Sequence, residues 1–518
     1  MGLLGPLLLA LLGLGLGLAA AAETSVNASL GLEFSLGEFR DFMLNRPFPE
    51  EAILRHITSN VTFIIFQVHS QYENITISLS KNPLPDASGT GVDKGLVSIL
   101  KPEQSNCSWY LEISDADKVR SVAVPLSYSE KDPIPGGCNL EFDLDVDPNI
   151  YLEYNLYETV IKFAPANLGY ARGRDPLPCD LGTGLDSRWR LEYDVYQYFL
   201  PENNLTEEVL LRHMEKMSMV SQVEANGFKV ATLKSSDKTI VYFSSVPGQG
   251  VIYNVIVRDP VLNTSAAYVP AHTYACHFNA ILDNCSSLGR LSTKVFFTIF
   301  AILGLFICFF GHRFWKTELF FIGFIFVGFF FYILITRLTL LQYDGDLKIF
   351  HDDAVFWVAF SCMTISIPVV FIGCLRILNI LTCGITGSYC VVLAIDSYFY
   401  TSLSYITLNV LKRAVNTNFN RAYTNVPFQT NDFVILAIWG MLAVSGITLQ
   451  IRRERGRPFF PPHPYKTWKR ERERRVTNIL DPSYHVRPLR ERLYSKLVQF
   501  KQLFQEEEAA GERTPLLL

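Results

Sequence analysis

Short runs in which apolar and polar residues alternate, or β-branched residues gather, dominate the first 290 residues, with Gly, Pro or Asn between the runs. The clearest are VTFIIFQVH, NITISLS, SVAVPLSYS, NLEFDLDV, YLEYNLYETVIKFAP, TIVYFSSV and GVIYNVIVRD. Many short strands separated by turn residues are typical of β-sandwiches. One stretch, Leu205–Met219, has helical spacing instead. A single sandwich does not need so long a chain, so we expect two modules that divide near residues 138–150.

Long uninterrupted apolar runs replace this alternation in the second half of the chain. A membrane-spanning helix needs about 20 mainly apolar residues. Five segments approach or meet this length: Val295–Phe310, Leu319–Thr336, Ala354–Leu375, Ile377–Ser397 and Phe433–Ile451. Small residues such as Gly384 and Gly387 would let two helices approach closely. The predicted fold class is therefore mixed: a β-sandwich-type ectodomain, residues 23–293, followed by an α-helical polytopic membrane domain, residues 294–451.

The N-terminal segment Met1–Ala22 has the apolar core and small-residue end of a secretory signal peptide, although no Lys or Arg precedes the core. An uncleaved first membrane helix is the alternative. Glycosylation sequons predict that residues 23–293 are luminal or extracellular, because sugar is added to exposed Asn side chains in the lumen. Seven sequons occur, all between Met1–Ala22 and the first predicted span at Val295, and they begin at Asn27, Asn60, Asn74, Asn106, Asn204, Asn263 and Asn284.

Basic residues are distributed unevenly around the apolar runs and predict the orientation of the membrane helices. The connection GHRFWK is basic, the connection YDGDLKIFHDD is acidic, and the tail, residues 452–518, is strongly basic. Five crossings place the N-terminus outside and the C-terminus in the cytoplasm, in a multi-pass protein of the plasma membrane and/or endolysosomal system. The connection Tyr398–Asp432 should then be luminal, yet it carries Lys412 and Arg413. Its part Thr401–Leu411 is expected to lie on the bilayer as an amphipathic segment.

Ten cysteines divide evenly between the two halves of the chain. Those of the predicted ectodomain are Cys107, Cys138, Cys179, Cys276 and Cys285. An oxidising compartment favours disulfides between them. We predict that Cys107 pairs with Cys138 and Cys276 with Cys285, because each pair brackets a compact stretch. The odd number leaves Cys179 alone or makes this pairing wrong.

The sequence contains no G-x-S-x-G, H-E-x-x-H or P-loop pattern, so we expect a non-enzymatic protein without cofactors. A metal site at His272, Cys276 and His277 is the alternative to the disulfide at Cys276, and the other histidines are scattered. Asp396 is notable because a carboxylate at membrane depth is costly. The Tyr and Phe residues beside it predict a place at the membrane interface, and an ion or proton relay is the alternative.

The predicted cytoplasmic tail carries two candidate interaction segments. After Pro488, the stretch LRERLYSKLVQFKQLF has apolar residues at helical spacing with basic residues beside them. It predicts an amphipathic helix that rests on anionic lipid, binds a partner or packs on the membrane helices. The terminal GERTPLLL matches an acidic-dileucine sorting pattern through Glu512, Leu516 and Leu517. An exposed terminus after a polar stretch would be accessible to clathrin adaptors, which predicts endosomal or lysosomal sorting.

Several long segments are distinctive enough to indicate a family. They are TELFFIGFIFVGFFFYILITRLTLLQYD, HDDAVFWVAFSC, RILNILTCG, FQTNDFVILAIWGML, QIRRERGRPFFPPHPYK and, in the first half, CDLGTGLDSRWRL and GQGVIYNVIV. The chain resembles, over essentially its whole length, the transmembrane 7 superfamily member 3 family. That name implies seven spans where five are found. The abrupt connection Tyr343–Lys348 is where two consecutive spans would be missing, and their loss would leave the tail on the same side of the membrane.

The resemblance implies a plasma-membrane or endomembrane protein that supports cell survival and relieves endoplasmic-reticulum stress, a process linked to the unfolded protein response. Two hypotheses follow for how it acts. In the first, a receptor-like or adaptor-like protein binds an unknown luminal or extracellular protein through its ectodomain. In the second, the helical bundle is part of a transporter or channel, and Asp396 distinguishes this hypothesis from the first. No feature indicates nucleic-acid binding.

Overall fold

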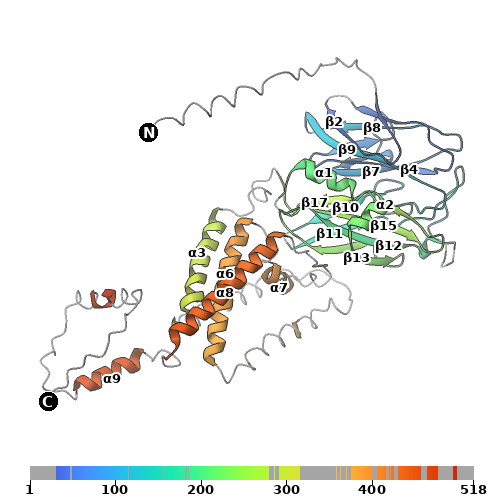
Figure 1. Ribbon diagram of the computed structural model, residues 1–518. Helices are drawn as coiled ribbons and strands as arrows, with labels where there is room; N and C mark the ends of the chain where they lie inside the picture. Colours follow the sequence, from blue (N-terminus) through green and yellow to red (C-terminus); the bar gives the residue numbers. More distant parts are fainter. Residues whose placement is uncertain are drawn as a thin grey trace, which may run out of the picture. The chain divides into compact units, whose positions relative to one another are not determined.

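The computed structural model describes residues 31–278, apart from a few single positions, and parts of the second half of the chain. The main parts are residues 291–314, 375–399, 405–415, 419, 422–424, 430–456, 464–476 and 494–498. Two compact units are distinguished, Met1–Arg453 and Glu454–Leu518. The first unit holds two β-sandwiches and a set of long apolar helices (Figure 1).

The first sandwich has two facing sheets of five and four strands. The first sheet follows the order β1 (Leu32–Phe34), β3 (Glu50–Leu54), β8 (Cys107–Ile113), β5 (Ile75–Ser78) and β6 (Ser88–Gly91). The second follows the order β2 (Arg40–Asn45), β9 (Lys118–Tyr128), β4 (Phe63–His69) and β7 (Asp93–Ile99). Trp109 is fully buried between the sheets, stacks on Phe66 at 4.4 Å and donates its indole N–H to Ser98. A short 3-10 turn, η1 (Pro85–Ala87), precedes β6.

The second sandwich combines a three-stranded sheet with a larger one. The smaller sheet follows the order β10 (Ile150–Tyr154), β11 (Glu158–Phe163) and β14 (Ile240–Ser244). The larger follows the order β13 (Phe228–Lys234), β12 (Glu192–Phe199), β15 (Val251–Asp259) and β16 (Thr264–Ala267), and β17 (Ala271–Thr273) also pairs with β15. A 3-10 turn, η2 (Arg188–Arg190), precedes β12, and two helices, α1 (Glu207–Glu215) and α2 (Val220–Asn226), follow it. The helix expected at Leu205–Met219 is therefore present, in a shorter form.

One expected strand, NLEFDLDV, does not form, because the Asn139 side chain makes hydrogen bonds with backbone groups that a strand would use for pairing. Its amide donates to the carbonyl of Phe142, and its oxygen accepts from the backbone N–H groups of Glu141 and Phe142. Local bonds of this kind compete with strand pairing. The segment is a series of bends in the described structure, and the alternation that suggested a strand leaves Leu140 exposed to solvent.

The two sandwiches share a continuous apolar core. Every residue of β4 is buried, so this strand has no solvent face. Ile64 and Phe66 point into the first sandwich, whereas Phe63 and Ile65 pack with residues of the second, including Tyr268. Burying both faces of a central strand gives an uninterrupted apolar run rather than alternation, which VTFIIFQVH displays. The two sandwiches thus form one joined body within the first unit.

Close approach at this interface requires a glycine in β7. A Cβ atom on Gly95 would lie 2.5 Å from a methyl group of Val269 in the second sandwich. The Asn149 side chain also pairs with the Gly95 backbone, accepting from its N–H at 2.7 Å and donating to its carbonyl at 3.1 Å. The second sandwich therefore hydrogen-bonds directly to a strand of the first.

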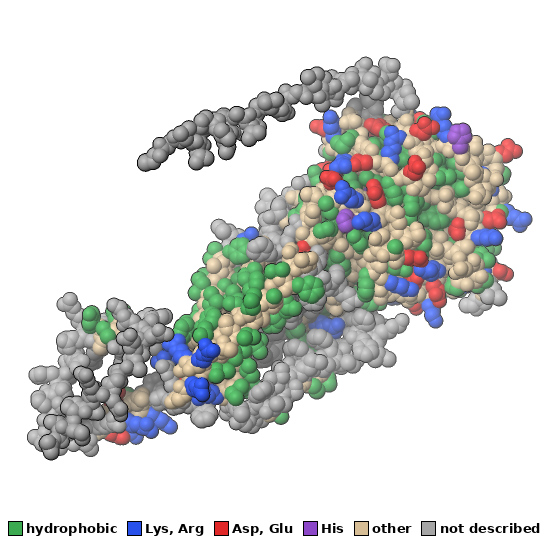
Figure 2. All heavy atoms as spheres, in the orientation of Figure 1, with side chains coloured by type: hydrophobic (Ala, Val, Ile, Leu, Met, Phe, Trp, Pro, Cys, Tyr) green, Lys and Arg blue, Asp and Glu red, His purple; other side chains and the backbone are tan. Residues whose placement is uncertain are grey.

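Three helices of the described residues are long and apolar enough to cross a membrane: Lys294–Phe314, Arg376–Tyr398 and Thr430–Glu454. They correspond to α3 (Leu291–Phe310) with the 3-10 turn η4 (Gly311–Phe314), α6 (Leu375–Phe399) and α8 (Thr430–Glu454). The spans expected at Leu319–Thr336 and Ala354–Leu375 lie outside the described residues, except for single positions and Leu375. Hydrophobic side chains gather over this helical part, whereas charged side chains are interspersed over the sandwiches (Figure 2).

Small residues let these helices pack closely, as their sequence predicts. A Cβ atom on Gly387 of α6 would lie 2.4 Å from the backbone nitrogen of Cys308 in α3. A Cβ atom on Gly384 would lie 2.5 Å from the Ile447 side chain in α8. Close packing of this kind stabilises the association of helices in lipid, where burial of apolar side chains contributes little because lipid is apolar as well.

The second unit contains α9 (Pro464–Val476), whose sequence PYKTWKRERERRV is strongly basic. Tyr465 and Trp468 are exposed, and their rings stack at 5.8 Å. The Arg472 guanidinium lies 5.3 Å from the Trp468 ring centre. Only residues 494–498 of the expected tail helix after Pro488 are described, and these are helical and exposed. The terminal residues Glu512, Leu516 and Leu517 lie outside the described residues.

Candidate functional site

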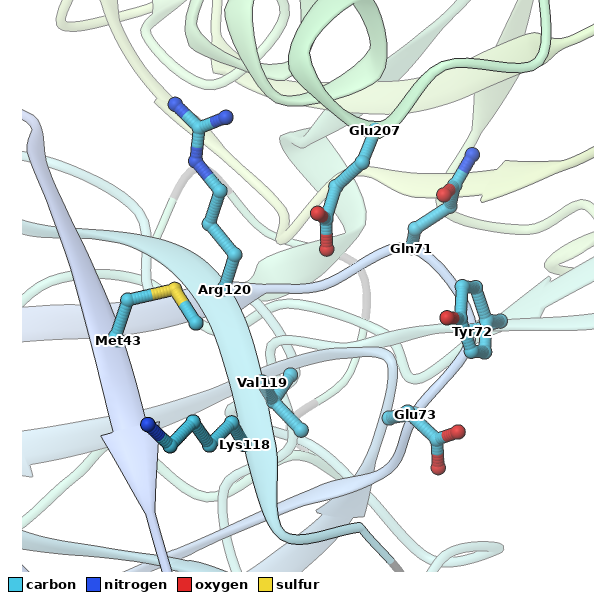
Figure 3. Close-up of a pocket in the computed structure, with 8 residues that line it drawn as sticks. All are labelled: Met43, Gln71, Tyr72, Glu73, Lys118, Val119, Arg120 and Glu207. Atoms are coloured by element: carbon cyan, nitrogen blue, oxygen red, sulfur yellow. The ribbon is translucent and has the colours of Figure 1, made fainter.

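A surface pocket of about 270 Å³ opens where the first sandwich meets α1 of the second (Figure 3). Met43 of β2 and the start of β9 form one side, the loop after β4 forms another, and Glu207 at the beginning of α1 closes it. Its lining residues are Met43, Gln71, Tyr72, Glu73, Lys118, Val119, Arg120 and Glu207. The pocket therefore combines residues of the first sandwich with Glu207 of the second.

Charges of both signs meet in this pocket. Figure 3 shows Arg120 and Glu207 extending into the same space from β9 and from α1. Asp41 on the neighbouring strand accepts three hydrogen bonds from the Arg120 guanidinium, at 3.2 and 3.1 Å and one shorter. Partial burial raises the pKa of Glu207, and the positive charge of Arg120 opposes this effect. Lys118 is exposed at the rim of the pocket. Asp41 forms its ion pair with Arg120, so the positive charge of Lys118 is not neutralised by Asp41.

Gln71 connects the pocket wall to the interior of the molecule. Its side-chain amide donates to the carbonyl of Leu205, just before α1, at 2.8 Å. Its backbone carbonyl lies 2.9 Å from a ring nitrogen of His272 in β17. The next residue, Tyr72, is half exposed and its ring lies 5.4 Å from that of Phe278. The wall of the pocket is thus held by three separate parts of the second sandwich.

None of the pocket residues was expected from the sequence. They come from two strands, a loop and a helix start that are far apart along the chain, and they mix exposed and half-buried residues with the buried Gln71 and Val119. No short motif marks them. His69 and Asp93 were not expected either, and His272 was considered only as a metal ligand, because the interface alone brings these three residues together.

A second region of interest lies where the connection between α6 and α8 meets the second sandwich. The helix α7 (Tyr405–Val415) and the residues after it contact the edge of β14. Tyr423 extends this sheet by one bridge: its N–H donates to Tyr242 at 2.9 Å, and its carbonyl accepts from Ser244 at 2.9 Å. Phe419 is fully buried, and the Lys412 ammonium lies 5.8 Å from the centre of its ring. This connection therefore docks on the second sandwich.

The same contact explains the basic residues that seemed out of place in this connection. Lys412 and Arg413 are buried in protein rather than displayed beside lipid. The Lys412 ammonium donates to the Ser244 hydroxyl at 3.0 Å and to the Ser245 carbonyl at 2.7 Å. Burial lowers the pKa of Lys412 to about 8. The positive-inside rule counts accessible charges, so buried ones say little about orientation.

Asp396 lies near the end of α6 that is closest in sequence to α7, and it is buried. Two more carboxyl groups approach this point. Burial raises the pKa of Glu202, in the second sandwich, to about 7, and the neighbouring Asp432 and Asp396 add to this rise. Asp432 belongs to the first turn of α8 and is fully buried. Asp396 thus faces protein groups at the junction of the helices with the second sandwich.

The disulfides differ from the expected pairing in one case. Cys276 pairs with Cys285, as predicted. Cys138, however, pairs with Cys179, and the prediction that it pairs with Cys107 is wrong. Cys107 begins β8 in the core of the first sandwich and is a buried free thiol, whereas both partners of Cys138–Cys179 belong to the second sandwich. Nearness along the chain favoured the wrong partner because it ignored the boundary between the sandwiches.

The disulfide at Cys276 also removes the alternative of a metal site with His272 and His277. Its sulfur is bonded to Cys285, and the two histidines contact different groups. His272 lies against Asp93, and His277 lies 2.6 Å from the hydroxyl of Tyr154. Among the described residues no group of His, Cys, Asp and Glu has the arrangement of a metal site.

The predicted glycosylation residues fall mostly on the surface. Asn60, Asn74, Asn106 and Asn263 are exposed, and Asn204 is half-buried just before α1. Asn27 and Asn284 lie outside the described residues. Exposure is required of a sugar acceptor, so the four exposed residues remain the better candidates.

Sequence comparison with known families accounts for nearly the whole chain. Residues 31–128 match the TM7SF3-like, N-terminal immunoglobulin-like domain, and residues 133–279 match the TM7SF3-like, second immunoglobulin-like domain. The boundary between the two thus falls slightly before the expected 138–150. The TM7S3/TM198-like domain matches residues 297–350 and 340–451.

Curated relatives extend over the full length. Transmembrane 7 superfamily member 3 from human is 66% identical over 570 aligned positions, with 100% of each chain covered. The mouse protein of the same name is 63% identical over 548 positions, covering 96% of this chain and 97% of the relative. The 570 positions exceed the 518 residues of this chain by 52. This difference, and the meeting of the two membrane-domain matches at residues 340–350, agree with two spans missing near Tyr343–Lys348.

Solved structures offer only a distant likeness. A β-glucuronidase from Parabacteroides merdae aligns with 44% of this chain and 28% of its own, at 9% identity and a TM-score of 0.19. That score is too low to support an inference about activity. The matches along the whole chain lead to one conclusion: this is a membrane protein with two immunoglobulin-like domains, and it belongs to the transmembrane 7 superfamily member 3 family.

Proposed function

We propose that this chain is a non-enzymatic membrane protein whose joined sandwiches bind a luminal or extracellular protein, and that it thereby supports cell survival and attenuates endoplasmic-reticulum stress. The observation that carries the binding proposal is the pocket between the first sandwich and α1. Its charged residues come from both sandwiches, and the fixed interface holds them in place before a partner arrives. Such preorganisation favours binding because little order has to be created on association. The role in survival is supported by family membership alone.

Charge reversal at the pocket rim tests this proposal. In cells that lack the endogenous protein and carry the Lys118→Glu variant, we expect weaker partner binding by about tenfold, because a misplaced rim charge slows association and repels a complementary surface. Survival under a calcium-pump inhibitor, which stresses the endoplasmic reticulum without blocking glycosylation, should then fall to the level of cells without the protein. Survival and unfolded-protein-response transcripts are the measurements.

Lys81→Glu is the matched control, because Lys81 is also an exposed lysine of the first sandwich and lies outside the pocket. It makes the same change in net charge and should protect cells as the natural chain does. Equal protection by both variants, at equal surface abundance, would remove the pocket from the proposal.

A role as a transporter or channel component is the second candidate, and one observation favours it. Glu202, Asp396 and Asp432 come together where α6 ends and α8 begins, and Glu202 has a pKa of about 7. A group of this kind can exchange protons near neutral pH. Asp396→Asn should abolish a pH-driven flux in vesicles that contain the purified chain, while leaving protection in the cell assay intact. A chain with Asp396→Asn that transports normally, or no flux at all in the natural chain, would dispose of this candidate.

The remaining proposals concern location. The N-terminal segment Met1–Ala22 is proposed as a signal peptide, the sequons as glycosylated, and the tail as cytoplasmic. Basic α9 beyond the last span supports this orientation, since basic residues concentrate on the cytoplasmic side. We further propose that Glu512, Leu516 and Leu517 bind clathrin adaptors and direct the protein between the plasma membrane and the endolysosomal system.

A further inference from the structure

Three side chains from both sandwiches meet in the buried interface. Asp93, the first residue of β7, lies between His69 of β4 and His272 of β17, and all three are buried. One carboxylate oxygen is 2.8 Å from Nδ1 of His69. The other is 2.6 Å from Nδ1 of His272 and accepts the backbone N–H of His272 at 2.8 Å. Asp93 and His69 belong to the first sandwich and His272 to the second, so these bonds cross the interface.

The surroundings of His272 require a charged ring. Its Nδ1 faces the Asp93 carboxylate, and its Nε2 lies 2.9 Å from the carbonyl oxygen of Gln71. Neither oxygen can donate a hydrogen bond when Asp93 is ionised. Both ring nitrogens must then carry hydrogen, which is the imidazolium form. A neutral ring would place a lone pair against an oxygen on one side, at a distance where a hydrogen bond should be.

His69 differs in this respect. Its Nδ1 can donate to Asp93, whereas its Nε2 has no hydrogen-bond partner among the described residues. The neutral tautomer with hydrogen on Nδ1 satisfies this arrangement, because an unpaired nitrogen lone pair is preferable to an unpaired buried N–H. The presence or absence of one proton, on His272, therefore decides whether Asp93 faces a positively charged ring across the interface.

We propose that protonated His272 clamps the two sandwiches together through Asp93 and Gln71, and that loss of its proton loosens both the interface and the pocket wall formed by Gln71. The clamp is a property of the interface and does not require a bound partner. Its effect on partner binding rests on the function proposed above, because Gln71 belongs to that pocket. A compartment whose pH lies below the raised pKa of His272 would then hold the pocket in the shape described here, and one whose pH lies above it would relax the pocket.

The sign of the pH dependence follows from the groups around His272. Burial disfavours its charge, but the Asp93 charge, the Asp93 hydrogen bond and the Gln71 carbonyl outweigh burial and raise the pKa of His272 above 6.5. A raised pKa contributes stability that is complete below the ordinary value and is lost as pH rises through the raised one. For Asp93, burial is likewise outweighed, by both histidines, and its pKa is held well below 3.8. The ion pair is thus intact from mildly acidic pH up to the raised pKa of His272.

Other charged groups near the clamp do not reverse this sign. Lys94, the neighbour of Asp93, interacts with Asp93, Asp143 and Asp147, and burial lowers its pKa. Tyr274 presents its ring edge to His272 at 6.1 Å, and burial raises the pKa of Tyr274 to about 12. Tyr274 keeps its proton over the range in which His272 loses one, and Lys94 adds a positive charge that the three carboxylates offset.

Hydrogen exchange of the full chain in detergent micelles tests the clamp directly. The protection of residues 271–273, after correction for the intrinsic pH dependence of exchange, should be constant at mildly acidic pH. It should then fall by at most about tenfold per pH unit between the ordinary pKa of histidine and the raised pKa of His272, the limit for release of one proton, and level off above the raised pKa. Measurements between about pH 6 and about pH 9 bracket an ordinary and a raised histidine. Residues 70–73 of the pocket wall should lose protection over the same range.

His272→Gln removes the titrating group and should give a profile without this slope, at lower protection throughout. His213→Gln is the matched control: it removes a histidine of the same sandwich, on α1, whose pKa burial lowers, and the slope should survive. If His272→Gln does not fold, the natural chain decides by itself, since a flat profile there overturns the clamp. A slope that persists in His272→Gln overturns it as well. Because no partner is present, failure of the cell assay leaves this result unaffected.

Discussion

Replacement of both Cys138 and Cys179 by Ser is expected to lower the free energy of unfolding of the second sandwich by about 4 kcal/mol. The disulfide closes a loop across a sequence separation of 41, and cross-linking a loop of this length removes that much conformational free energy from the unfolded chain. The bond also holds the Cys179 region against the segment that contains Gly137, whose carbonyl oxygen lies close to the Cys179 sulfur. Thermal or urea unfolding of the purified chain, followed by exchange at β11 and β15, measures the loss.

Two variants serve as comparisons for this disulfide. Cys276→Ser with Cys285→Ser opens a loop with a sequence separation of only 9, for which the same relation gives about 3 kcal/mol. Cys107→Ser alters a free thiol in the first sandwich and breaks no disulfide in the described structure. The result to look for is a loss of stability of the second sandwich that is largest in the Cys138 and Cys179 variant, smaller in the Cys276 and Cys285 variant and absent in Cys107→Ser. Loss of the first sandwich in that variant would favour the pairing with Cys107 instead.

Phe419→Ala is expected to detach the connection after α7 from the second sandwich. The side chain is fully buried, and removal of a buried phenylalanine costs about 3–5 kcal/mol. Other contacts include the bridge between Tyr423 and β14, the ring contact of Tyr423 with Phe243 at 6.0 Å, and the bonds of Lys412 to Ser244 and Ser245. The buried charge of Lys412 loses its hydration on docking, which works against the contact. Without Phe419 these other contacts should not hold the segment, so residues 240–244 should exchange hydrogen faster and residues 405–423 should become sensitive to protease.

The control for this prediction is Phe228→Ala, which removes the same side chain from β13 of the same sandwich at a position that is 56% exposed. It should leave protease sensitivity and exchange at β14 unchanged. If Phe419→Ala and Phe228→Ala behave alike, Phe419 does not anchor the connection. If the first variant alone releases it, docking of this connection on the second sandwich depends on Phe419.

Much of the architecture could be predicted because its causes are local. Alternation and turn residues predict strands such as β11 and β15, and uninterrupted apolar runs predict α6 and α8. Where prediction failed, a local rule met a competing interaction: the Asn139 side chain replaced strand pairing in NLEFDLDV, and short sequence separation favoured Cys107 as the partner of Cys138. The candidate pocket was not foreseen at all, because its lining residues share no pattern along the chain.

The sequence by itself determined the class of protein, since hydrophobic periodicity and length decide whether a segment forms a half-buried strand or a membrane helix, whatever it later contacts. Only the tertiary structure decided which residues act together. Asp93 and His272 are 179 residues apart, and Gln71 and His272 are 201 apart. Burial in a shared interface brings them within hydrogen-bond distance, and it is the loss of water there that gives a single proton its effect on the contact.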